Sequence, residues 1–476
     1  MNRPVFLPAF CLLSADGQDT MPVQLYRDIL AAIREGRIKK GSKLPSSRKA
    51  AESLGVSRTT VNAAYELLRA EGVLSVRQGA VPAIHVPEWP VKSETSSFSH
   101  DLSKRGQGIC KDLRRNSFVA DQGRMSPGVP DEALFPAQEW ARLSRQMARR
   151  KHGALSAYGS PYGAPALRAV LAERLFTDRG ITVSPDQILV TTGTQASLSL
   201  IAQVMTDPGE CAAVEDPCHL GARTAFLGAG LTVAPVPVDD DGLDPDLLPD
   251  QTRLIYITPS NQYPLGCRLS LSRRMMLLEK ARSMQAMVLE DDYDSEFLWR
   301  GKEIAALTAH AAGEEVIYLS SASKVLLPGL RVGWMAVPER LVGPFRAAIR
   351  NIGIMANVHA QLVLADMMRS GLYRGQLRRI SRIYENRGKA LFQALSCNDA
   401  VEVKEPDGGV QLAVRFHAGG RETDALTALA HHGFRPARLS THSLSGTMEG
   451  LIVGFADANE NTIRKFCSVL EQVLKQ

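Results

Sequence analysis

Close to the N-terminus, the apolar positions of the chain follow a helical period in three successive segments. Leu25, Ile29 and Ile33 recur every four residues, which predicts a helix with a single buried face. Serine is a preferred helix cap because its hydroxyl accepts a hydrogen bond from an amide of the first turn. Ser46 and Ser57 are therefore expected to begin two further helices. The three predicted helices cover residues 22–34, 46–54 and 57–71.

Two short apolar runs after these helices, residues 73–76 and 82–86, are expected to pair as a β-hairpin. Three helices followed by a hairpin form a winged helix-turn-helix domain, which we predict for residues 20–88. In that fold the second helix of the turn lies in the DNA major groove, with its first residues nearest the bases. The residues expected to contact DNA are Ser57, Arg58, Thr59 and Thr60, together with Arg48 of the preceding helix.

The segment that follows, residues 89–121, mixes Pro, Ser, Lys, Asp and Arg without periodicity, which predicts a linker. From about residue 122, helical patterns alternate with short apolar runs that are expected to be buried strands. This alternation is typical of an α/β domain with a mostly parallel sheet, whose ligands gather at the carboxyl ends of strands. The predicted strands are residues 188–191, 211–214, 231–234, 254–258, 287–289, 316–319 and 334–337.

The same pattern divides this second domain, residues 122–476, into two parts. The predicted strands fall in a large part of about residues 150–345. After about residue 338 helices dominate, apart from a β-containing segment near residues 409–416 and a final helix from Glu460. These features predict a smaller C-terminal α+β part of about residues 346–476.

The net charge of +6 is concentrated in the predicted winged-helix domain. Residues 21–85 contain eleven Lys or Arg and five acidic residues, a surplus equal to that of the whole chain. A basic module on a nearly neutral body favours a polyanionic partner, although charge alone is equally typical of a solvated helical surface. Together with the helix-turn-helix pattern, it predicts double-stranded DNA as a partner.

Seven cysteines are scattered along the chain, and none forms a CxxC pair. This argues against a disulfide framework and against a zinc site, and it favours a reducing compartment. We therefore predict no metal. No apolar run is long enough to span a bilayer, and the apolar residues 5–13, interrupted by Pro8, lack the features of a signal peptide. We expect that segment to be a strand or arm, and the protein to be cytoplasmic.

The most suggestive chemistry lies in the loop after the predicted strand 316–319. Lys324 is flanked by Ser321 and Ser323, and Arg331 follows seven residues later. Serine hydroxyls and a guanidinium suit a phosphate, because phosphate accepts several charge-assisted hydrogen bonds at once. A lysine amine forms an imine with an aldehyde. The loop therefore predicts an anchor for pyridoxal 5'-phosphate, with Lys324 as the Schiff-base residue.

Two other strand ends are expected to complete this cofactor site. Gly193, Thr194 and Gln195 follow a strand and open a helix, whose N-terminus attracts anions, although a plain strand-to-helix turn is equally typical of this pattern. Asp291 and Tyr293 are two residues apart and share a face of an extended segment. The carboxylate would keep the pyridine nitrogen protonated, and the phenol would bond the ring oxygen. The alternatives are an acidic loop that caps the sheet, or a metal site that no nearby histidine supports.

Two polar residues that follow other strands have two interpretations each. His219 either stacks on the flat cofactor ring or is a structural histidine with its own partners. Asn261 either bonds the ring oxygen of the cofactor or holds a turn. Both are included among the candidate cofactor-binding residues.

These residues carry a resemblance to a known family. The chain resembles the MocR/GabR-type regulators, in which a GntR-type winged helix is fused to a fold-type I aminotransferase-like domain. The resemblance covers nearly the whole chain, and the Lys324 loop is its most specific element. Its motifs are residues 44–48 (LPSSR), 54–61 (LGVSRTTV), 64–65, 71–72, 128–131, 134–136, 193–195, 290–297 (EDDYDSEF), 323–324 and 328–331.

The resemblance implies a role for each matching residue. Lys324 carries pyridoxal phosphate, Asp291 meets its ring nitrogen, Tyr293 its ring oxygen, and Arg331 its phosphate. It also implies a head-to-tail homodimer, in which each DNA-binding domain packs on the cofactor domain of the partner.

Three departures from the family pattern bear on function. The family usually has tyrosine where His219 stands, which alters ring stacking. The wing, residues 77–82, lacks the usual glycine-rich tip, and Pro82 removes an N–H from the hairpin. Aminotransferases commonly place a carboxylate-binding arginine where this chain has Ile452, and Arg438 or Arg435 are the candidates to replace it.

These expectations define one function and two alternatives. The first is a pyridoxal-phosphate-dependent transcriptional regulator of metabolic genes that senses an amine, an amino acid or the cofactor itself, and Ile452 favours the cofactor. The second is a catalytically active aminotransferase with an appended DNA-binding domain. The third is a DNA-binding protein with an empty, vestigial enzyme domain, against which the intact Lys324, Asp291, Tyr293 and Arg331 argue.

Overall fold

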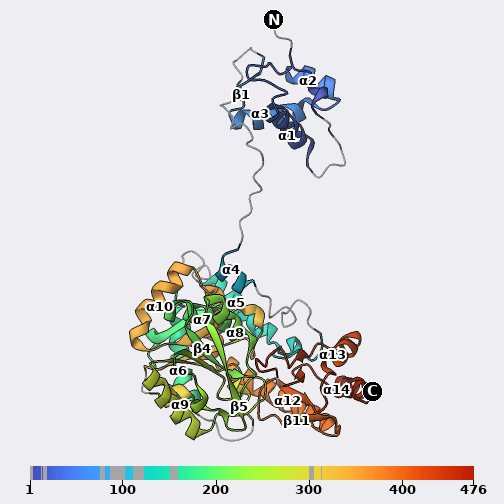
Figure 1. The fold of residues 1–476 in the computed structure, drawn as a ribbon. Coiled ribbons are helices and arrows are strands. Elements are labelled where there is room, and N and C mark those ends of the chain that lie inside the picture. Colours follow the sequence, from blue (N-terminus) through green and yellow to red (C-terminus); the bar gives the residue numbers. More distant parts are fainter. Residues whose placement is uncertain are drawn as a thin grey trace. The chain divides into compact units, whose positions relative to one another are not determined.

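The computed structural model describes residues 4–11, 13, 19–75, 81–85, 102–110, 123–150, 159–299, 305–311, 314–446 and 448–475. The chain divides into two compact units, Met1–Asp101 and Leu102–Gln476 (Figure 1). Each unit has a hydrophobic core of its own.

The N-terminal unit is a bundle of three helices with a short hairpin. The helices are α1 (Met21–Arg34), α2 (Ser47–Leu54) and α3 (Arg58–Ala70), and strand β1 (Leu74–Ser75) pairs antiparallel with β2 (Ala83–Ile84). The predicted stripe of Leu25, Ile29 and Ile33 is buried against Val61 and Leu68 of α3. The predicted winged helix-turn-helix fold is confirmed. The expected wing tip, residues 77–80, lies outside the described residues.

Local capping fixes where α2 and α3 begin. The Ser46 hydroxyl accepts a hydrogen bond from the Lys49 amide at 3.4 Å, and the Ser57 hydroxyl accepts one from the Thr60 amide at 3.1 Å. Gly55, which ends α2, has a φ of 67°, a left-handed conformation that glycine adopts without a Cβ penalty. These short-range contacts produce the tight turn of the motif.

The segment expected to be an N-terminal strand or arm contains a 3-10 turn, η1 (Leu7–Ala9), and no strand among the described residues 4–11. Pro8 lacks the N–H that a strand ladder requires. Leu7 and Cys11, four residues apart, are both buried in the core of the N-terminal unit. The apolar run therefore packs its side chains into this core from a helical turn. The expectation of a strand was wrong.

The second unit is built around an eight-stranded sheet in the order β3-β10-β9-β8-β7-β4-β5-β6. The five strands from β9 to β5 are parallel, whereas β10 is antiparallel to both of its neighbours and β6 is antiparallel to β5. All seven predicted strands are present, and β6 is an addition. The strands are β3 (Ile188–Thr191), β4 (Cys211–Asp216), β5 (Thr232–Asp239), β6 (Gly242–Leu243), β7 (Thr252–Ile257), β8 (Met287–Asp291), β9 (Val316–Ser321) and β10 (Gly333–Ala336).

Helices cover both faces of this sheet, so that alternate residues of its strands enter different cores. In β7, Leu254 and Tyr256 pack with α7 and α8, whereas Ile255 and Ile257 pack with α9. The fold-type I arrangement of a mostly parallel sheet between helices is confirmed. The helices of this part are α6 (Pro165–Arg179), α7 (Thr194–Met205), α8 (Leu220–Ala229), α9 (Leu271–Met284) and α10 (Glu339–Ile352).

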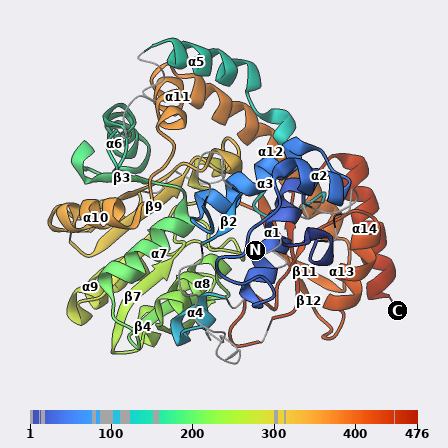
Figure 2. The same cartoon turned by 90° about the horizontal axis from the view of Figure 1, so that it is seen from above.

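The C-terminal part contains a second, antiparallel sheet in the order β11-β12-β14-β13. Helices α13 and α14 lie beside each other against this sheet, and α5 lies along α11 (Figure 2). The final helix begins at Glu460, as predicted. The elements are α5 (Ala137–Arg149), α11 (Val358–Arg369), α12 (Leu372–Leu395), β11 (Val401–Val403), β12 (Gln411–Phe416), α13 (Glu422–His431), β13 (Ala437–Arg438), β14 (Gly450–Gly454) and α14 (Glu460–Leu474).

A short helix, α4 (Lys104–Ile109), lies within the segment predicted to be a linker. The Arg105 side chain donates a hydrogen bond to the carbonyl of Gly228, at the end of α8, at 3.3 Å. This part of the segment is therefore packed on the second unit. In the described segments, no helix combines the length and the apolar character needed to cross a membrane.

Arg274 of α9 holds two loops against the edge of the large sheet. Its side chain is fully buried and donates hydrogen bonds to the carbonyls of Leu269, Pro259 and Ala305 at 2.9, 3.0 and 3.0 Å. Arg274→Met removes three hydrogen bonds and leaves the carbonyls of Leu269 and Ala305 without this donor, whereas the Pro259 carbonyl keeps the Leu269 amide. We therefore expect the free energy of unfolding to fall by about 3 kcal/mol in urea denaturation. The exposed Glu279→Gln on the same helix is the control, with a change within about 0.5 kcal/mol. Equal stabilities of the two variants would contradict this role of Arg274.

Candidate functional site

Lys324 lies in a turn that directly follows β9, at the start of the loop between β9 and β10. Its Nζ donates a hydrogen bond to the carbonyl of Gly128. Burial lowers the pKa of the Lys324 amine, and the carboxyl groups of Asp294 and Asp291 act in the opposite direction. A lowered pKa leaves more of the amine in its unprotonated, nucleophilic form, which imine chemistry requires.

Asp291 is the last residue of β8 and faces the α7 and α8 side of the sheet, like Leu289 two residues earlier. The residue is 5% exposed, and its Oδ2 accepts a hydrogen bond from the Tyr256 hydroxyl at 2.7 Å. Its Oδ1 has no hydrogen-bond partner among the described residues. Burial raises the pKa of Asp291 to about 7, against the lowering effects of Tyr256 and Lys324. One carboxyl oxygen is therefore held by the protein, and the other is left to a ligand.

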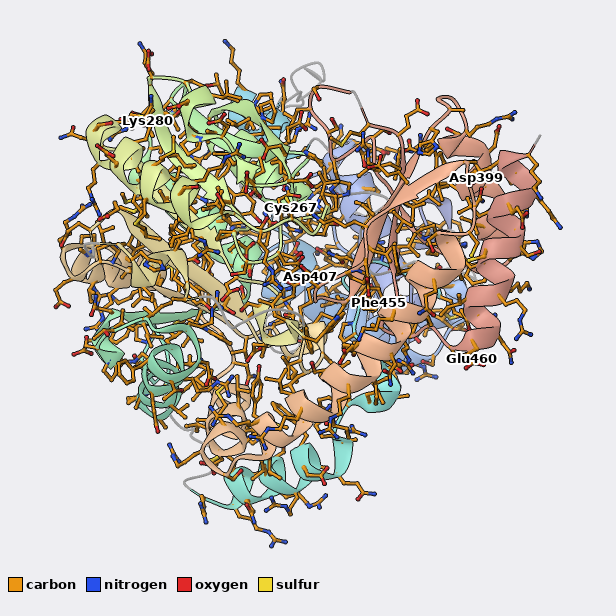
Figure 3. All side chains as sticks on the ribbon, turned by 90° about the horizontal axis from the view of Figure 1, so that it is seen from below. Cys267, Lys280, Asp399, Asp407, Phe455 and Glu460 are labelled. Atoms are coloured by element: carbon orange, nitrogen blue, oxygen red, sulfur yellow. The ribbon has the colours of Figure 1, made fainter. Side chains whose placement is uncertain are left out.

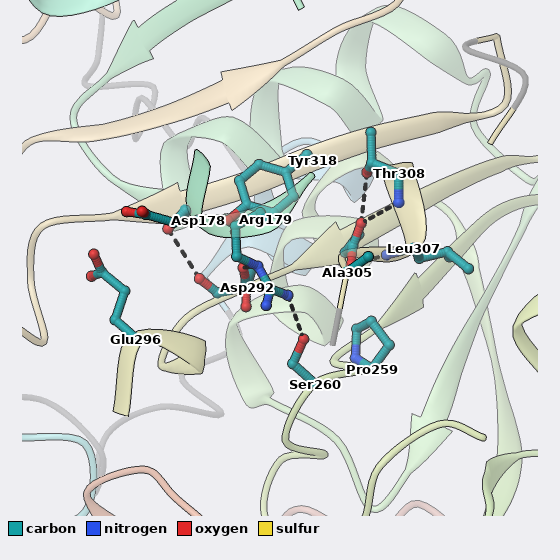
Figure 4. Close-up of polar contacts among 12 residues, drawn as sticks. Asp178, Arg179, Pro259, Ser260, Asp292, Glu296, Ala305, Leu307, Thr308 and Tyr318 are labelled. Atoms are coloured by element: carbon teal, nitrogen blue, oxygen red, sulfur yellow. Dashed lines mark hydrogen bonds and ion pairs between the residues drawn. The ribbon is translucent and has the colours of Figure 1, made fainter. Parts of the chain in front are cut away.

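Asp292, the next residue, points to the opposite face of the sheet, because side chains alternate along an extended chain. There its carboxylate lies 2.8 Å from Nε of Arg179 and accepts a hydrogen bond from the Tyr318 hydroxyl at 2.5 Å. Arg179 also donates to the Ser260 hydroxyl at 2.7 Å (Figure 4). The side chains of Arg179 and Asp292 are nearly inaccessible to solvent. This buried ion pair secures the backbone on which Asp291 stands.

A corner suited to an anion forms where the N-terminus of α7 meets β10. Gly193 precedes α7 with a φ of 128°, and a Cβ at this position would lie 3.8 Å from the Arg331 guanidinium. A Cβ on Gly333 would lie 2.6 Å from the Cα of Gly193, so only glycine permits this close approach. The structure therefore brings Arg331 to the first turn of α7, which starts at Thr194 and attracts anions through its free N–H groups.

The remaining phosphate candidates lie close to this corner in the fold. Ser321 ends β9, and its hydroxyl accepts a hydrogen bond from the Ser323 amide at 3.4 Å, in the turn that carries Lys324. Gln195 donates from its side-chain amide to the carbonyl of Gly221 in α8 at 3.1 Å. Gln195 therefore links α7 to α8. Contacts of Ser321, Ser323 and Gln195 with a phosphate stay predictions.

Tyr293 and Asn261 lie around a buried carboxyl group. Asn261 donates from its amide to Asp294 at 2.7 Å, so Asn261 has a protein partner at the predicted site. Burial raises the pKa of Asp294 to about 8. Burial and the nearby Asp294 raise the pKa of Tyr293 well above its ordinary value, which keeps the phenol protonated. Gly409 passes so close that a Cβ there would lie 2.6 Å from the Asp294 carboxyl.

An aromatic cluster surrounds Tyr263, a residue that no sequence pattern indicated. The Tyr263 ring lies 5.4 Å from the ring of His219, 5.9 Å from that of Tyr293 and 5.4 Å from that of His442. His442 comes from the C-terminal part and is bonded through Nδ1 to the Cys218 carbonyl at 2.9 Å. Burial lowers the pKa of His442 to about 4, so this ring is neutral at physiological pH. His219 is thus part of a packed aromatic group.

Hydrogen bonds join the C-terminal part to the end of β4. The Asp216 carboxylate accepts from the backbone amides of Leu444 and Ser445 at 2.7 and 2.9 Å. The Cys218 amide donates to the His442 carbonyl at 3.0 Å. The loop that carries His442 is therefore docked on the large part beside His219.

A pocket of about 20 Å3 lies between the loop after β7 and the antiparallel sheet. Arg268 of the large part lies 3.8 Å from Asp407 of the C-terminal part in an ion pair across this boundary, and Figure 3 shows the neighbouring Cys267 and Asp407 near each other. The residues that line the pocket include Asn261, Tyr293, Lys404, Glu405, Gln411 and Ala413.

Ile452 is fully buried in β14, opposite Ala413 of β12. The two arginines considered as replacements for an arginine at this position are engaged elsewhere. Arg438 donates to the Glu422 carboxylate at 2.9 Å, and Arg435 donates to the carbonyl of Ala430 at 3.0 Å.

In the N-terminal unit, four of the five residues predicted to contact DNA are exposed to solvent. They are Arg48, Ser57, Arg58 and Thr59. The hydroxyls of Ser57 and Thr60 lie 2.8 Å apart and hydrogen-bond each other within the cap of α3. The exposed group presents a cationic and polar surface at the start of the predicted recognition helix, and DNA contact by all five residues stays a prediction.

The second unit fits pyridoxal phosphate in three respects. It offers an amine with a lowered pKa, a buried carboxyl oxygen without a partner, and a helix N-terminus beside a guanidinium. These groups suit an aldehyde, a pyridine nitrogen and a phosphate respectively. Within the described segments, no group of three or more His, Cys, Asp or Glu side chains is arranged to hold a metal ion.

The sequence patterns did not indicate four residues of this region, namely Tyr256, Tyr263, Gln411 and His442. A hydroxyl in an otherwise apolar buried strand needs a partner, and that requirement was the available signal for Tyr256. Gln411 and His442 come from the C-terminal part and reach the site through tertiary packing, for which a single sequence offers no signal.

The fold and the site define a two-domain class: a winged-helix DNA-binding domain joined to an aminotransferase-type domain. Residues 124–434 match the family described as "Aminotransferase class I and II", and residues 23–81 match "Bacterial regulatory proteins, gntR family".

Relatives of known name share this architecture over most of their length. The chain is 35% identical to the probable rhizopine catabolism regulatory protein MocR of Rhizobium meliloti, over 95% of this chain and 94% of that protein. It is 29% identical to the pyridoxine biosynthesis transcriptional regulator PdxR of Corynebacterium glutamicum, over 94% of both chains. The chain therefore belongs to the MocR-type family of transcriptional regulators.

Solved structures agree for the second unit. The kynurenine aminotransferase of Pyrococcus horikoshii, described in complex with PMP, has a TM-score of 0.70 at 25% identity over 76% of this chain and 93% of that one. The α-aminoadipate aminotransferase LysN of Thermus thermophilus has a TM-score of 0.72 at 26% identity over 78% and 97%. This aminotransferase fold implies a dependence on pyridoxal phosphate.

The raised pKa of Asp291 predicts a pH dependence of stability for the protein stripped of cofactor. The folded protein holds this proton up to about pH 7, whereas an unfolded chain releases it at about pH 4. Asp291 therefore contributes most to stability below pH 4, and this contribution falls as pH rises to 7. Replacing Asp291 with Asn removes the ionisation. We expect the loss of unfolding free energy between pH 5 and pH 8 to shrink by about 3 kcal/mol.

Urea denaturation at the two pH values measures this effect. The exposed Asp250→Asn is the matched control and leaves the pH dependence as it is in the parent. A loss of unfolding free energy that is as large in Asp291→Asn as in the parent would show that other groups cause it.

Proposed function

We propose that this regulator binds pyridoxal phosphate at Lys324 and uses it to sense an amine, an amino acid or the cofactor itself, changing the transcription of metabolic genes. The observation that carries the proposal is that the Lys324 amine and the unpaired Oδ1 of Asp291 both lie at the carboxyl ends of neighbouring strands, β9 and β8. When bound, the cofactor supplies an aldehyde that condenses with amines and a ring that accepts electron density.

Each residue has a proposed task in holding the cofactor. Lys324 supplies the amine that bonds the aldehyde, and Asp291 binds the ring N–H through Oδ1. The ring oxygen is bonded by Tyr293 and Asn261, and His219 packs on the ring face. The phosphate is held at the α7 corner by Gly193, Thr194, Gln195, Ser321, Ser323 and Arg331. The buried Arg179–Asp292 pair supports this arrangement by fixing the end of β8.

For the N-terminal unit, we propose residues 20–88 as the DNA-binding domain and 89–121 as the linker to the cofactor domain, 122–476. Arg58 and Thr59 would meet base edges or phosphates, with Arg48, Ser57 and Thr60 beside them. An effector changes DNA affinity only if it binds two arrangements of the protein unequally. We further propose a head-to-tail homodimer in the cytoplasm, as the family resemblance implies.

A working aminotransferase with a secondary DNA-binding domain is the second candidate, favoured by the completeness of the Lys324 site. Ile452 and the engaged Arg438 and Arg435 argue against ordinary amino-acid turnover, since the main anchor for a carboxylate is missing. Titration of the purified protein with amines distinguishes the two functions. A visible absorbance change coupled to DNA affinity supports the regulator, whereas released keto acid with unchanged DNA affinity supports the enzyme.

Lys324→Ala separates cofactor binding from DNA binding. We expect the visible absorbance band of the bound cofactor to disappear, because the amine that bonds the aldehyde is gone. Basal affinity for DNA should remain within about threefold, since a cofactor-site change leaves the phosphate contacts of a separate domain intact. The probe is a duplex selected from a random library by the full-length protein.

The control for this variant is Lys280→Ala on the surface helix α9 (Figure 3), which keeps the band. Loss of both the band and basal DNA binding in Lys324→Ala would refute the separation of roles.

Arg58→Ala tests the recognition helix. If Arg58 reads a base or binds a phosphate, its loss weakens binding to the selected duplex by roughly tenfold to a hundredfold, with no change in the cofactor spectrum. A phosphate contact also lowers the slope of log affinity against log salt by about one, whereas a base contact relaxes sequence preference.

Arg69→Ala, an exposed arginine at the other end of α3, is the matched control and leaves affinity nearly unchanged. Identical affinities of the two variants would remove Arg58 from the DNA interface.

A further inference from the structure

Gln411 is a buried polar side chain without a partner. The residue begins β12 and is 7% exposed. Neither its Oε1 nor its Nε2 has a hydrogen-bond partner among the described residues. An amide that is buried without hydrogen bonds is costly, so such a group in a folded protein requires an explanation, and a bound ligand is one.

The amide of Gln411 lies beside the amine of Lys324. A Cβ built on Gly128 would lie 2.7 Å from Lys324 Nζ and 3.4 Å from Gln411 Oε1. The two side chains therefore converge on one point of the backbone. Gln411 also lines the pocket that contains Tyr293 and Asn261. If an effector amine binds at the position of Lys324 Nζ, the substituents on the carbon next to that amine would lie close to the Gln411 amide.

Several polar side chains of the site are paired with one another. Asn261 donates to Asp294, and Tyr256 donates to one oxygen of Asp291. The other oxygen of Asp291 has no partner among the described residues, and the proposed function assigns it to the ring nitrogen of the cofactor. The donor and the acceptor of Gln411 therefore remain for a molecule that enters the pocket.

The charged residues around Gln411 do not favour a carboxylate on the effector. Ile452 stands where aminotransferases commonly place an arginine, and the two arginines considered as replacements are engaged elsewhere. Lys404 lines the pocket, and its amine lies 3.4 Å from a carboxyl oxygen of Asp240. A substituent close to the bound amine consequently meets the neutral amide of Gln411.

A neutral amide distinguishes between an amide and a carboxylate. A carboxamide has one acceptor and two donors, so it satisfies both ends of a glutamine side chain. A carboxylate has acceptors only, so it satisfies Nε2 and places its negative charge against Oε1. An unpaired buried acceptor beside a charge is unfavourable.

We propose that Gln411 binds the group on the carbon next to the amine of the effector, and that this group is uncharged, a carboxamide fitting best. This inference rests on the proposed function, because it requires the cofactor at Lys324 and an amine as effector.

The test uses the full-length protein with its cofactor and two probes, L-alaninamide and L-alanine, which differ only in the group at issue. Each is titrated while the visible absorbance band and the affinity for the selected DNA duplex are recorded. We expect the parent protein to respond at lower concentrations of L-alaninamide. In Gln411→Met, which keeps the size of the side chain, this preference should fall roughly tenfold, the equivalent of about 1.4 kcal/mol. Differences in the intrinsic reactivity of the two amines cancel in this comparison.

Two further measurements separate binding from folding. Gln393→Met, an exposed glutamine of α12, is the matched control and keeps the parent preference. The cofactor-free Gln411→Met protein should be at least as stable as the parent in urea, because an unpaired amide is replaced by an apolar group. A loss of stability would indicate that Gln411 has a structural partner, which overturns the inference.

The remaining outcomes are also decisive. An unchanged preference in Gln411→Met, a parent preference for L-alanine, or a cofactor-loaded protein that responds to neither probe overturns the inference and leaves the cofactor site in place. A purified protein without any cofactor band overturns the proposed function and the inference with it.

Discussion

The cofactor region depends on how two successive carboxyl groups are separated at the end of β8. Asp292 faces one side of the sheet, where the buried Arg179 compensates its charge. Asp291 faces the other side, where Tyr256 satisfies one oxygen and burial raises the pKa of the group to about 7. A buried charge needs a partner, and the sheet provides one for Asp292 and only part of one for Asp291. The unpaired Oδ1 of Asp291 would accept a hydrogen bond from a protonated ring nitrogen.

Two structural layers contribute to this region. The large sheet supplies Asp291, Lys324 and the α7 corner, each at a strand end. The C-terminal part supplies Gln411 and the loop with His442, docked through the Asp216 carboxylate. A ligand held between the two layers bonds to both, so its binding energy depends on their relative placement. This dependence is the physical basis on which a small molecule selects between arrangements of a regulator.

Much of the fold was predictable from local patterns. The three short helices, their serine caps and the apolar strands are encoded within a few residues, and the structure has them where the pattern predicts. For the N-terminal apolar run, the strand that was one of the two expectations was wrong over residues 4–11, because alternation and helical spacing are indistinguishable in a short apolar stretch. Lys324, Asp291 and Arg331 were recognisable because Asp291 ends one strand of a parallel sheet and the other two lie in the loop after the neighbouring strand, at the same edge of the sheet.

The sequence by itself determined the architecture, the candidate anchor lysine and the family resemblance, since periodicity, caps and motifs are local properties. Only the tertiary structure decided which polar groups satisfy one another. It pairs Asn261 with Asp294, Arg438 with Glu422 and Tyr256 with Asp291, and it leaves Gln411 unpaired among the described residues. These outcomes depend on side chains that approach from strands and loops distant in sequence, and no local pattern encodes such distances.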